Sequence, residues 1–117
     1  MGRFGKLLRK ARRDARLGLA AVSARAGVST MYLADVEAGR RPPPIDARIA
    51  ELAEAIGIAP DELLGAAAQD RGWVRLGWRP RDRRKERLAR ELVARWPDMT
   101  AAEMEALERA LGKGRDK

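Results

Sequence analysis

The sequence contains no cysteine and no histidine, and only one phenylalanine, one tyrosine and three tryptophans occur among its 117 residues. Without cysteine and histidine, the chain can form no disulfide and lacks the usual zinc ligands and the thiol and imidazole groups of many catalytic sites. We therefore expect no enzyme activity, no metal site and no cofactor. No apolar run approaches the roughly 20 residues that span a bilayer, and no signal-peptide pattern precedes the first helix. These absences favour a reducing, cytoplasmic setting without membrane association.

The composition favours an all-α protein with a polyanionic partner. Lysine and arginine outnumber aspartate and glutamate, 25 to 17, which gives a net charge of +8 at pH 7. Such a charge balance favours a polyanionic binding partner but does not identify it. Alanine, leucine, arginine and glutamate are abundant, whereas β-branched and aromatic residues are few, and this composition is typical of helices.

Residues 27–39, G-V-S-T-M-Y-L-A-D-V-E-A-G, predict a short helix with a defined start and end. Ser29 is a suitable N-cap, and Gly39 is a suitable C-terminal stop. Leu33 and Val36 mark the inward side, and the outward side consists of Thr30, Met31, Ala34 and Asp35. A preceding helix over 19–26 ends at Gly27, so the two helices form a helix-turn-helix. The outward side suits a DNA major groove, with a surface helix of a small bundle as the alternative.

Several residues also share the spacing of one known family. They are Leu8-Arg9-Lys10-Ala11-Arg12, Leu17, Val22, Gly27-Val28-Ser29, Tyr32-Leu33, Val36-Glu37 and Gly39-Arg40-Arg41-Pro42. In this pattern the chain resembles the lambda Cro/cI repressor class, also called the XRE family, over residues 4 to about 65. The resemblance implies a five-helix lambda-repressor-like domain that binds double-stranded DNA. It also implies a transcription regulator of bacterial or phage type, nucleoid-associated when bound, which represses as a homodimer on an inverted-repeat operator.

The outward face of the helix over 30–38 and the basic connector after it give individual residues separate expected roles. The residues expected to read bases or groove shape are Thr30, Met31, Tyr32 and Asp35. The residues expected to contact phosphates are Ser29, Arg40 and Arg41. The resemblance further implies a partly buried structural ion pair between Arg12 of the first helix and Glu37. Leu19 departs from the family pattern, which usually has glutamine there, and Asp35 can only accept hydrogen bonds.

Beyond Gln69 the composition changes, and we expect three segments. These are a helix-turn-helix DNA-binding domain over 1–70, a basic connector with tryptophan and glycine over 71–80, and a C-terminal helical hairpin over 81–117. The hairpin is expected to have helices over 81–96 and 101–111, the second of which starts at a capping box formed by Thr100 and Glu103. Its apolar face consists of Leu88, Leu92, Trp96, Met104, Leu107 and Leu111.

Two short helices cannot bury this apolar face by themselves, so we expect it to mediate homodimerisation. Packing of the hairpin against the N-terminal domain is the alternative. Two other functions also fit the sequence. The chain could be the DNA-binding antitoxin of a toxin–antitoxin pair, with the C-terminal segment holding a partner protein. It could also be a protein-interaction module that no longer reads DNA, for which Leu19 and Asp35 are the hints.

Overall fold

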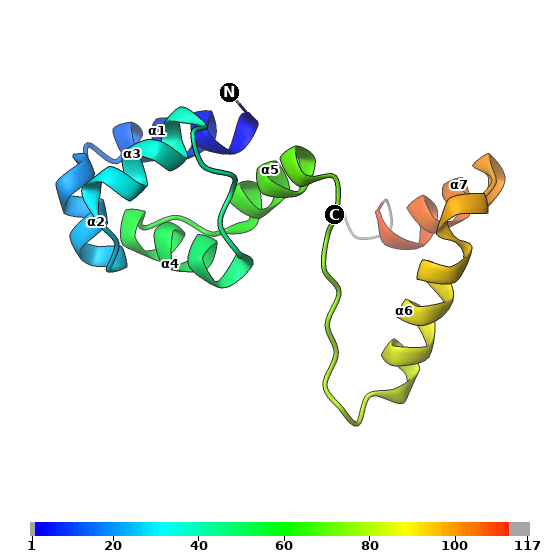
Figure 1. The fold of residues 1–117 in the computed structure, drawn as a ribbon. Coiled ribbons are helices and arrows are strands. Elements are labelled where there is room, and N and C mark those ends of the chain that lie inside the picture. Colours follow the sequence, from blue (N-terminus) through cyan, green and yellow to red (C-terminus); the bar gives the residue numbers. More distant parts are fainter. Residues whose placement is uncertain (1, 113–117) are drawn as a thin grey trace. The chain divides into compact units, whose positions relative to one another are not determined.

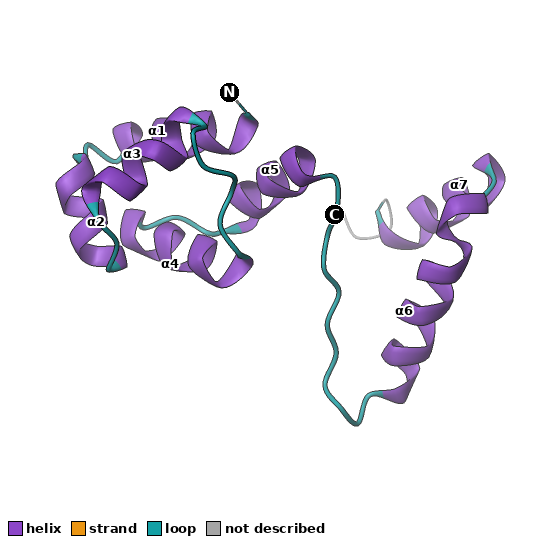
Figure 2. Ribbon diagram, in the orientation of Figure 1, coloured by secondary structure: helices purple, strands orange, loops and turns teal. Residues whose placement is uncertain are grey.

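Seven α-helices and one 3₁₀ helix form the computed structural model, which describes residues 2–112. The elements are α1 (Arg3–Asp14), α2 (Leu19–Ala26), α3 (Thr30–Ala38), α4 (Asp46–Ile56), α5 (Asp61–Arg71), α6 (Arg83–Arg95), η1 (Trp96–Asp98) and α7 (Ala101–Leu111). The described residues contain no strand, as Figure 2 shows, so the predicted all-α class is confirmed. Residues 113–117 of the expected C-terminal segment lie outside the described part of the chain.

The chain divides into two units, Met1–Val74 and Arg75–Lys117. The first unit contains α1 to α5, which surround one hydrophobic core (Figure 1). Helix α1 packs against α3 and α5, while α2 packs against α3 and α4. The largest buried apolar side chains of this core are Phe4, Leu8, Val22, Leu33, Val36, Ile49, Leu52 and Leu63. Burial of each such side chain contributes on the order of 1.5–3 kcal/mol, so this core accounts for the fold of the first unit.

Helix α1 is capped by a residue that lies far away in the sequence. Its own N-cap, Gly2, has no side chain to accept hydrogen bonds from the first backbone N–H groups. The Asp70 carboxylate of α5 accepts them instead, from the backbone N–H of Arg3 at 3.0 Å and of Phe4 at 2.9 Å. A carboxylate at this end also complements the helix dipole. Asp70 therefore joins the end of α5 to the start of α1.

Two predicted helices begin or end at other residues in the structure. The amphipathic pattern of residues 3–15 predicts a first helix that continues to residue 15, but the helix ends at Asp14, and Arg16 then adopts a positive φ of 61° as the chain turns. The helix expected over 81–96 runs from Arg83 to Arg95. It begins late because the Asp82 side chain accepts from the backbone N–H of Lys85 at 3.0 Å and acts as the N-cap. Both differences result from local capping geometry.

The second unit, which contains α6, η1 and α7, has no buried residue among its described positions. The predicted capping box of α7 is confirmed, because Thr100 and Glu103 each accept a hydrogen bond from the other's backbone N–H. The hydrogen bond from the Thr100 backbone, assisted by the charge of Arg95, lowers the pKa of Glu103. Arg95 forms an ion pair with Glu103, which joins the end of α6 to the start of α7.

Helices α1 and α3 approach each other closely at Gly5. A Cβ atom added at Gly5 would lie 2.4 Å from the carbonyl oxygen of Glu37 and 2.8 Å from that of Val36. These are backbone atoms of α3, so a side chain at this position would push the two helices apart. Gly65 of α5 is also helical, but an added Cβ there would meet no atom within 4 Å.

We expect Gly5→Ala to lower the free energy of unfolding by about 1–3 kcal/mol, because overpacking at a helix contact forces the backbone to shift. The matched control, Gly65→Ala, should raise it by about 0.5–1 kcal/mol, since alanine favours helix in open space. Urea denaturation of the full chain measures both. Equal effects of the two substitutions would show that α1 and α3 do not make this close contact.

Candidate nucleic-acid interface

Three residues form the turn between α2 and α3, and each of them helps to end α2 or to start α3. Gly27 adopts a left-handed conformation with φ 72°, which ends α2. The backbone N–H of Val28 then donates to the carbonyl of Ser23 at 3.0 Å. Ser29 begins α3, because its hydroxyl oxygen accepts from the backbone N–H of Tyr32 at 3.0 Å. These bonds fix the start of α3 relative to the end of α2.

Helix α3 presents its N-terminal residues to solvent while its other side is buried. Leu33 and Val36 are buried in the core together with the Glu37 carboxylate. Thr30 is exposed, and 74% of the Met31 surface is accessible to solvent, which is a large fraction for an apolar residue. The remaining positions on this side are half-buried, namely Tyr32, Ala34 and Asp35. The accessible end of α3 therefore presents three kinds of group to solvent: the hydroxyl of Thr30, the thioether of Met31 and the ring edge of Tyr32.

A buried ion pair connects α1 to α3. Arg12 Nε donates to Glu37 Oε2 at 2.7 Å, and Arg12 Nη2 donates to Glu37 Oε1 at 2.9 Å. Arg12 Nη1 also donates to the carbonyl of Leu17 at 3.0 Å, and Arg9 Nε lies 3.4 Å from Glu37 Oε1. Only 1% of Glu37 is exposed, so its charge depends on these partners. The hydrogen bond to Glu37 raises the pKa of Arg12 above its ordinary value.

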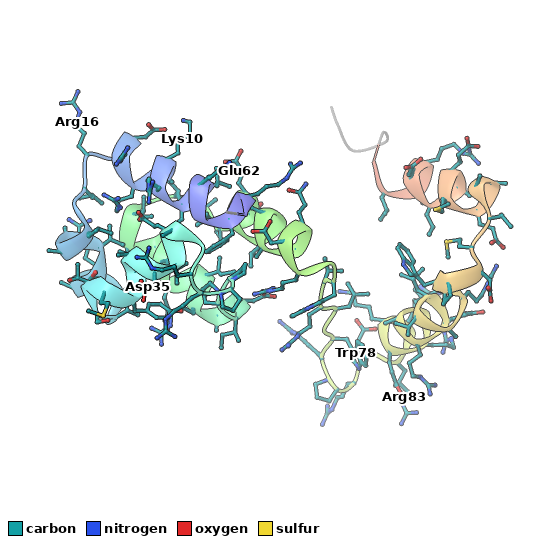
Figure 3. All side chains as sticks on the ribbon, turned by 45° about the horizontal axis from the view of Figure 1, so that its top comes forward. Lys10, Arg16, Asp35, Glu62, Trp78 and Arg83 are labelled. Atoms are coloured by element: carbon teal, nitrogen blue, oxygen red, sulfur yellow. The ribbon has the colours of Figure 1, made fainter. Side chains whose placement is uncertain are left out.

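Asp35 and the two arginines that follow α3 form a second polar cluster. Gly39 adopts φ 82° and turns the chain back, so that the backbone N–H groups of Arg40 and Arg41 donate to the Asp35 carbonyl at 2.9 and 3.3 Å. Arg40 Nε donates to Asp35 Oδ1 at 2.8 Å, while Arg41 Nε lies 4.0 Å from Asp35 Oδ2. The Arg41 guanidinium also lies 5.2 Å from the centre of the Tyr32 ring. Figure 3 shows Asp35 in this part of the first unit.

The structure thus brings two groups of predicted site residues into contact, the base readers Tyr32 and Asp35 with the phosphate-contacting Arg40 and Arg41. Sequence reasoning missed this contact. The signal for it was Gly39, because a left-handed residue after a helix returns the following residues to its last turn. Sequence reasoning also missed the capping of α1 by Asp70, for which no local pattern exists.

The residues expected at a dimer interface all lie in the second unit and are at least partly accessible. The structure leaves Leu88, Trp96, Met104 and Leu111 exposed, and Leu92 and Leu107 half-buried. Val93 is a further exposed apolar residue of α6, at 69%. These accessible apolar side chains are therefore concentrated on α6, η1 and α7.

Residues 2–112 contain neither a cluster of metal ligands nor a helix that could cross a membrane. No three acidic side chains in this range are grouped closely enough to hold a metal ion. None of the described helices combines the length and the apolar composition needed to cross a membrane.

Comparison with known protein families found one match in the first unit. A family model described as a helix-turn-helix domain matches residues 3–66, which is more than half of the chain. This range covers α1 to α4 and the first part of α5, and it includes both polar clusters. A comparison with curated proteins found no match.

The buried ion pair generates a stability prediction. We expect Glu37→Ala to lower the free energy of unfolding by about 3–5 kcal/mol, because it leaves the Arg12 charge buried without its partner. Glu37→Gln, which keeps one acceptor oxygen, should cost less. The control is Asp14→Ala, which breaks the exposed ion pair with Lys10 at 2.7 Å and should leave the denaturation midpoint unchanged. A Glu37→Ala midpoint equal to that of Asp14→Ala would contradict a structural role for the pair.

Proposed function

The chain belongs to the helix-turn-helix domain family, and from that premise we propose that it is a sequence-specific transcription regulator that binds double-stranded DNA. The observation that carries this proposal is the accessible N-terminal end of α3, whose opposite side is held by the buried contact between Arg12 and Glu37. A helix fixed in this way can enter a major groove without losing its orientation. The net charge of +8 supports a polyanionic partner.

In this proposal the exposed residues of α3 contact base edges. The Thr30 hydroxyl can donate and accept a hydrogen bond, and the Met31 side chain can contact a thymine methyl group. The Tyr32 edge fits against the groove wall. Ser29 keeps its hydroxyl proton available, because its oxygen only accepts from the Tyr32 backbone, so it can also donate to a phosphate.

Arg40 and Arg41 are proposed to contact phosphates. In the free protein Asp35 holds their guanidinium groups near the end of α3. Its carboxylate holds the Arg40 guanidinium at 2.8 Å. When Arg40 moves to a phosphate, the carboxylate becomes available to accept a hydrogen bond from a cytosine N4 group. Because 65% of the Arg40 side chain is exposed, exchanging one anion for another costs this arginine little.

We further propose that the protein is a homodimeric repressor that binds an inverted repeat. The accessible apolar residues of α6 and α7 support dimerisation, since a symmetric partner would remove them from water. Two reading helices would then contact half-sites about 34 Å apart, one turn of the duplex. Repression follows from the resemblance to the lambda Cro/cI class. A monomer that requires a second protein for stability would instead favour the antitoxin function.

Selection of bound duplexes from a random-sequence pool tests DNA reading and provides the probe for variants. We expect Thr30→Ala to change which bases are preferred at one or two positions, since each base contact contributes about 1–3 kcal/mol of discrimination. Arg41→Ala should weaken binding to all sequences nearly equally, because phosphates carry no sequence information. A pool that shows no enriched sequence, or a Thr30→Ala variant with unchanged preferences, would contradict this proposal.

Sedimentation of the full chain at micromolar concentration tests dimerisation. We expect a species of twice the chain mass, and Leu92→Glu should convert it to a monomer by placing a charge in the apolar interface. The matched control is Ala106→Glu, which adds the same charge to an exposed position of α7 away from Met104 and Leu107. A wild-type protein that sediments as a monomer would contradict the proposed dimer.

A further inference from the structure

The start of the second unit has an excess of positive charge. Residues 75–90 contain eight basic side chains and only two acidic ones, Asp82 and Glu86. Asp82 accepts from the Lys85 backbone, and Glu86 lies 3.8 Å from Arg90. No acidic side chain among residues 2–112 forms an ion pair with the five remaining arginines of the stretch 79–87, which are Arg79, Arg81, Arg83, Arg84 and Arg87.

Three arginines of α6 lie along one side of the helix. Arg83, Arg87 and Arg90 follow at intervals of four and three residues, the spacing that places side chains on the same helix face. We call these three residues the cationic ridge. All three are exposed, and Figure 3 labels Arg83 at the start of α6. The apolar Leu88 and Leu92 lie on the opposite side, so a partner that covers them leaves the ridge accessible.

This placement is unfavourable for the helix itself. Neighbouring like charges at this spacing destabilise a helix. Positive charges in the first turn also oppose the helix dipole, and α6 begins with Arg83, Arg84 and Lys85. Glu86 is the acidic residue of this turn and lies 3.8 Å from Arg90, so Arg83 and Arg87 are the ridge residues without an acidic partner within residues 2–112. An anion bound along the ridge would reduce the repulsion between its arginines.

The composition of this face distinguishes a nucleic acid from a protein as the anionic partner. Besides the arginines this face has Glu86, which lies 3.8 Å from Arg90, and Ala94, and it has no large apolar side chain. Protein interfaces have an apolar and aromatic centre, whereas DNA interfaces are polar and strongly positive. A row of guanidinium groups matches the repeated phosphates of a duplex.

We propose that the cationic ridge is a second DNA contact, which binds backbone phosphates of the same duplex that α3 reads. This inference rests on the proposed function, because it assigns DNA as the polyanion. It makes the second unit both the dimerisation segment, through the apolar side of α6, and a clamp on the DNA backbone, through the opposite side. The contact adds affinity on every sequence and no base preference.

The test compares the full-length wild type with the variant Arg83→Gln/Arg87→Gln/Arg90→Gln on a 30-base-pair duplex of random sequence. Glutamine preserves helix propensity, and circular dichroism and sedimentation verify that fold and oligomeric state are unchanged. The affinity is measured over a series of salt concentrations. We expect the slope of log affinity against log salt to become less steep by about 0.9 for each phosphate that the variant no longer neutralises.

The matched control is Arg109→Gln, which removes one exposed arginine from α7 and should leave the slope unchanged. A triple variant with the wild-type slope would overturn the proposal. If that variant instead failed to bind polyglutamate while keeping its DNA affinity, the ridge would be a site for an acidic protein and the proposal would be wrong. If the proposed function fails instead, the result is different. The wild type then enriches no sequence from a random pool, while the triple variant still has a less steep salt slope than the wild type.

Discussion

The contact between Arg12 and Glu37 is the interaction on which the first unit depends. It consists of two short hydrogen bonds, at 2.7 and 2.9 Å, between a buried carboxylate and a guanidinium of another helix. Such a pair adds little net stability, because the cost of desolvating both charges offsets their attraction. Removal of either partner, however, leaves the other charge unpaired in an apolar environment. The pair therefore specifies how α3 lies on α1. The contact of Gly5 with the α3 backbone reinforces the same arrangement.

Much of the fold follows from local sequence signals. The glycines at 27 and 39, the N-cap Ser29 and the capping box at Thr100 each determine an end of a helix through bonds within a few residues, and the structure contains all of them. The features that the sequence did not reveal depend on contacts between distant residues. Asp70 caps a helix that begins 67 residues earlier, which no local pattern indicates.

The candidate site was predicted only in outline for a similar reason. Periodicity indicated which side of α3 is accessible, but it gave no partner for the Asp35 carboxylate. Its pairing with Arg40 arises from the reversal of the chain at Gly39, and the cation–π contact of Arg41 with Tyr32 depends on the same reversal. In the proposed complex with DNA, Asp35 therefore exchanges one partner for another. The second unit differs, since none of its described residues is buried.

An NMR titration of the full chain would locate the DNA-contacting residues without any mutation. The ligand is a duplex enriched from a random-sequence pool. We predict that the largest changes in backbone amide shifts occur from Ser29 to Asp35 and at Arg40 and Arg41, because these residues meet the groove and its phosphates. The buried residues of α4 and α5 should change little. Large changes confined to α4 and α5, with unchanged signals from residues 29–35, would contradict the assignment of α3 as the reading helix.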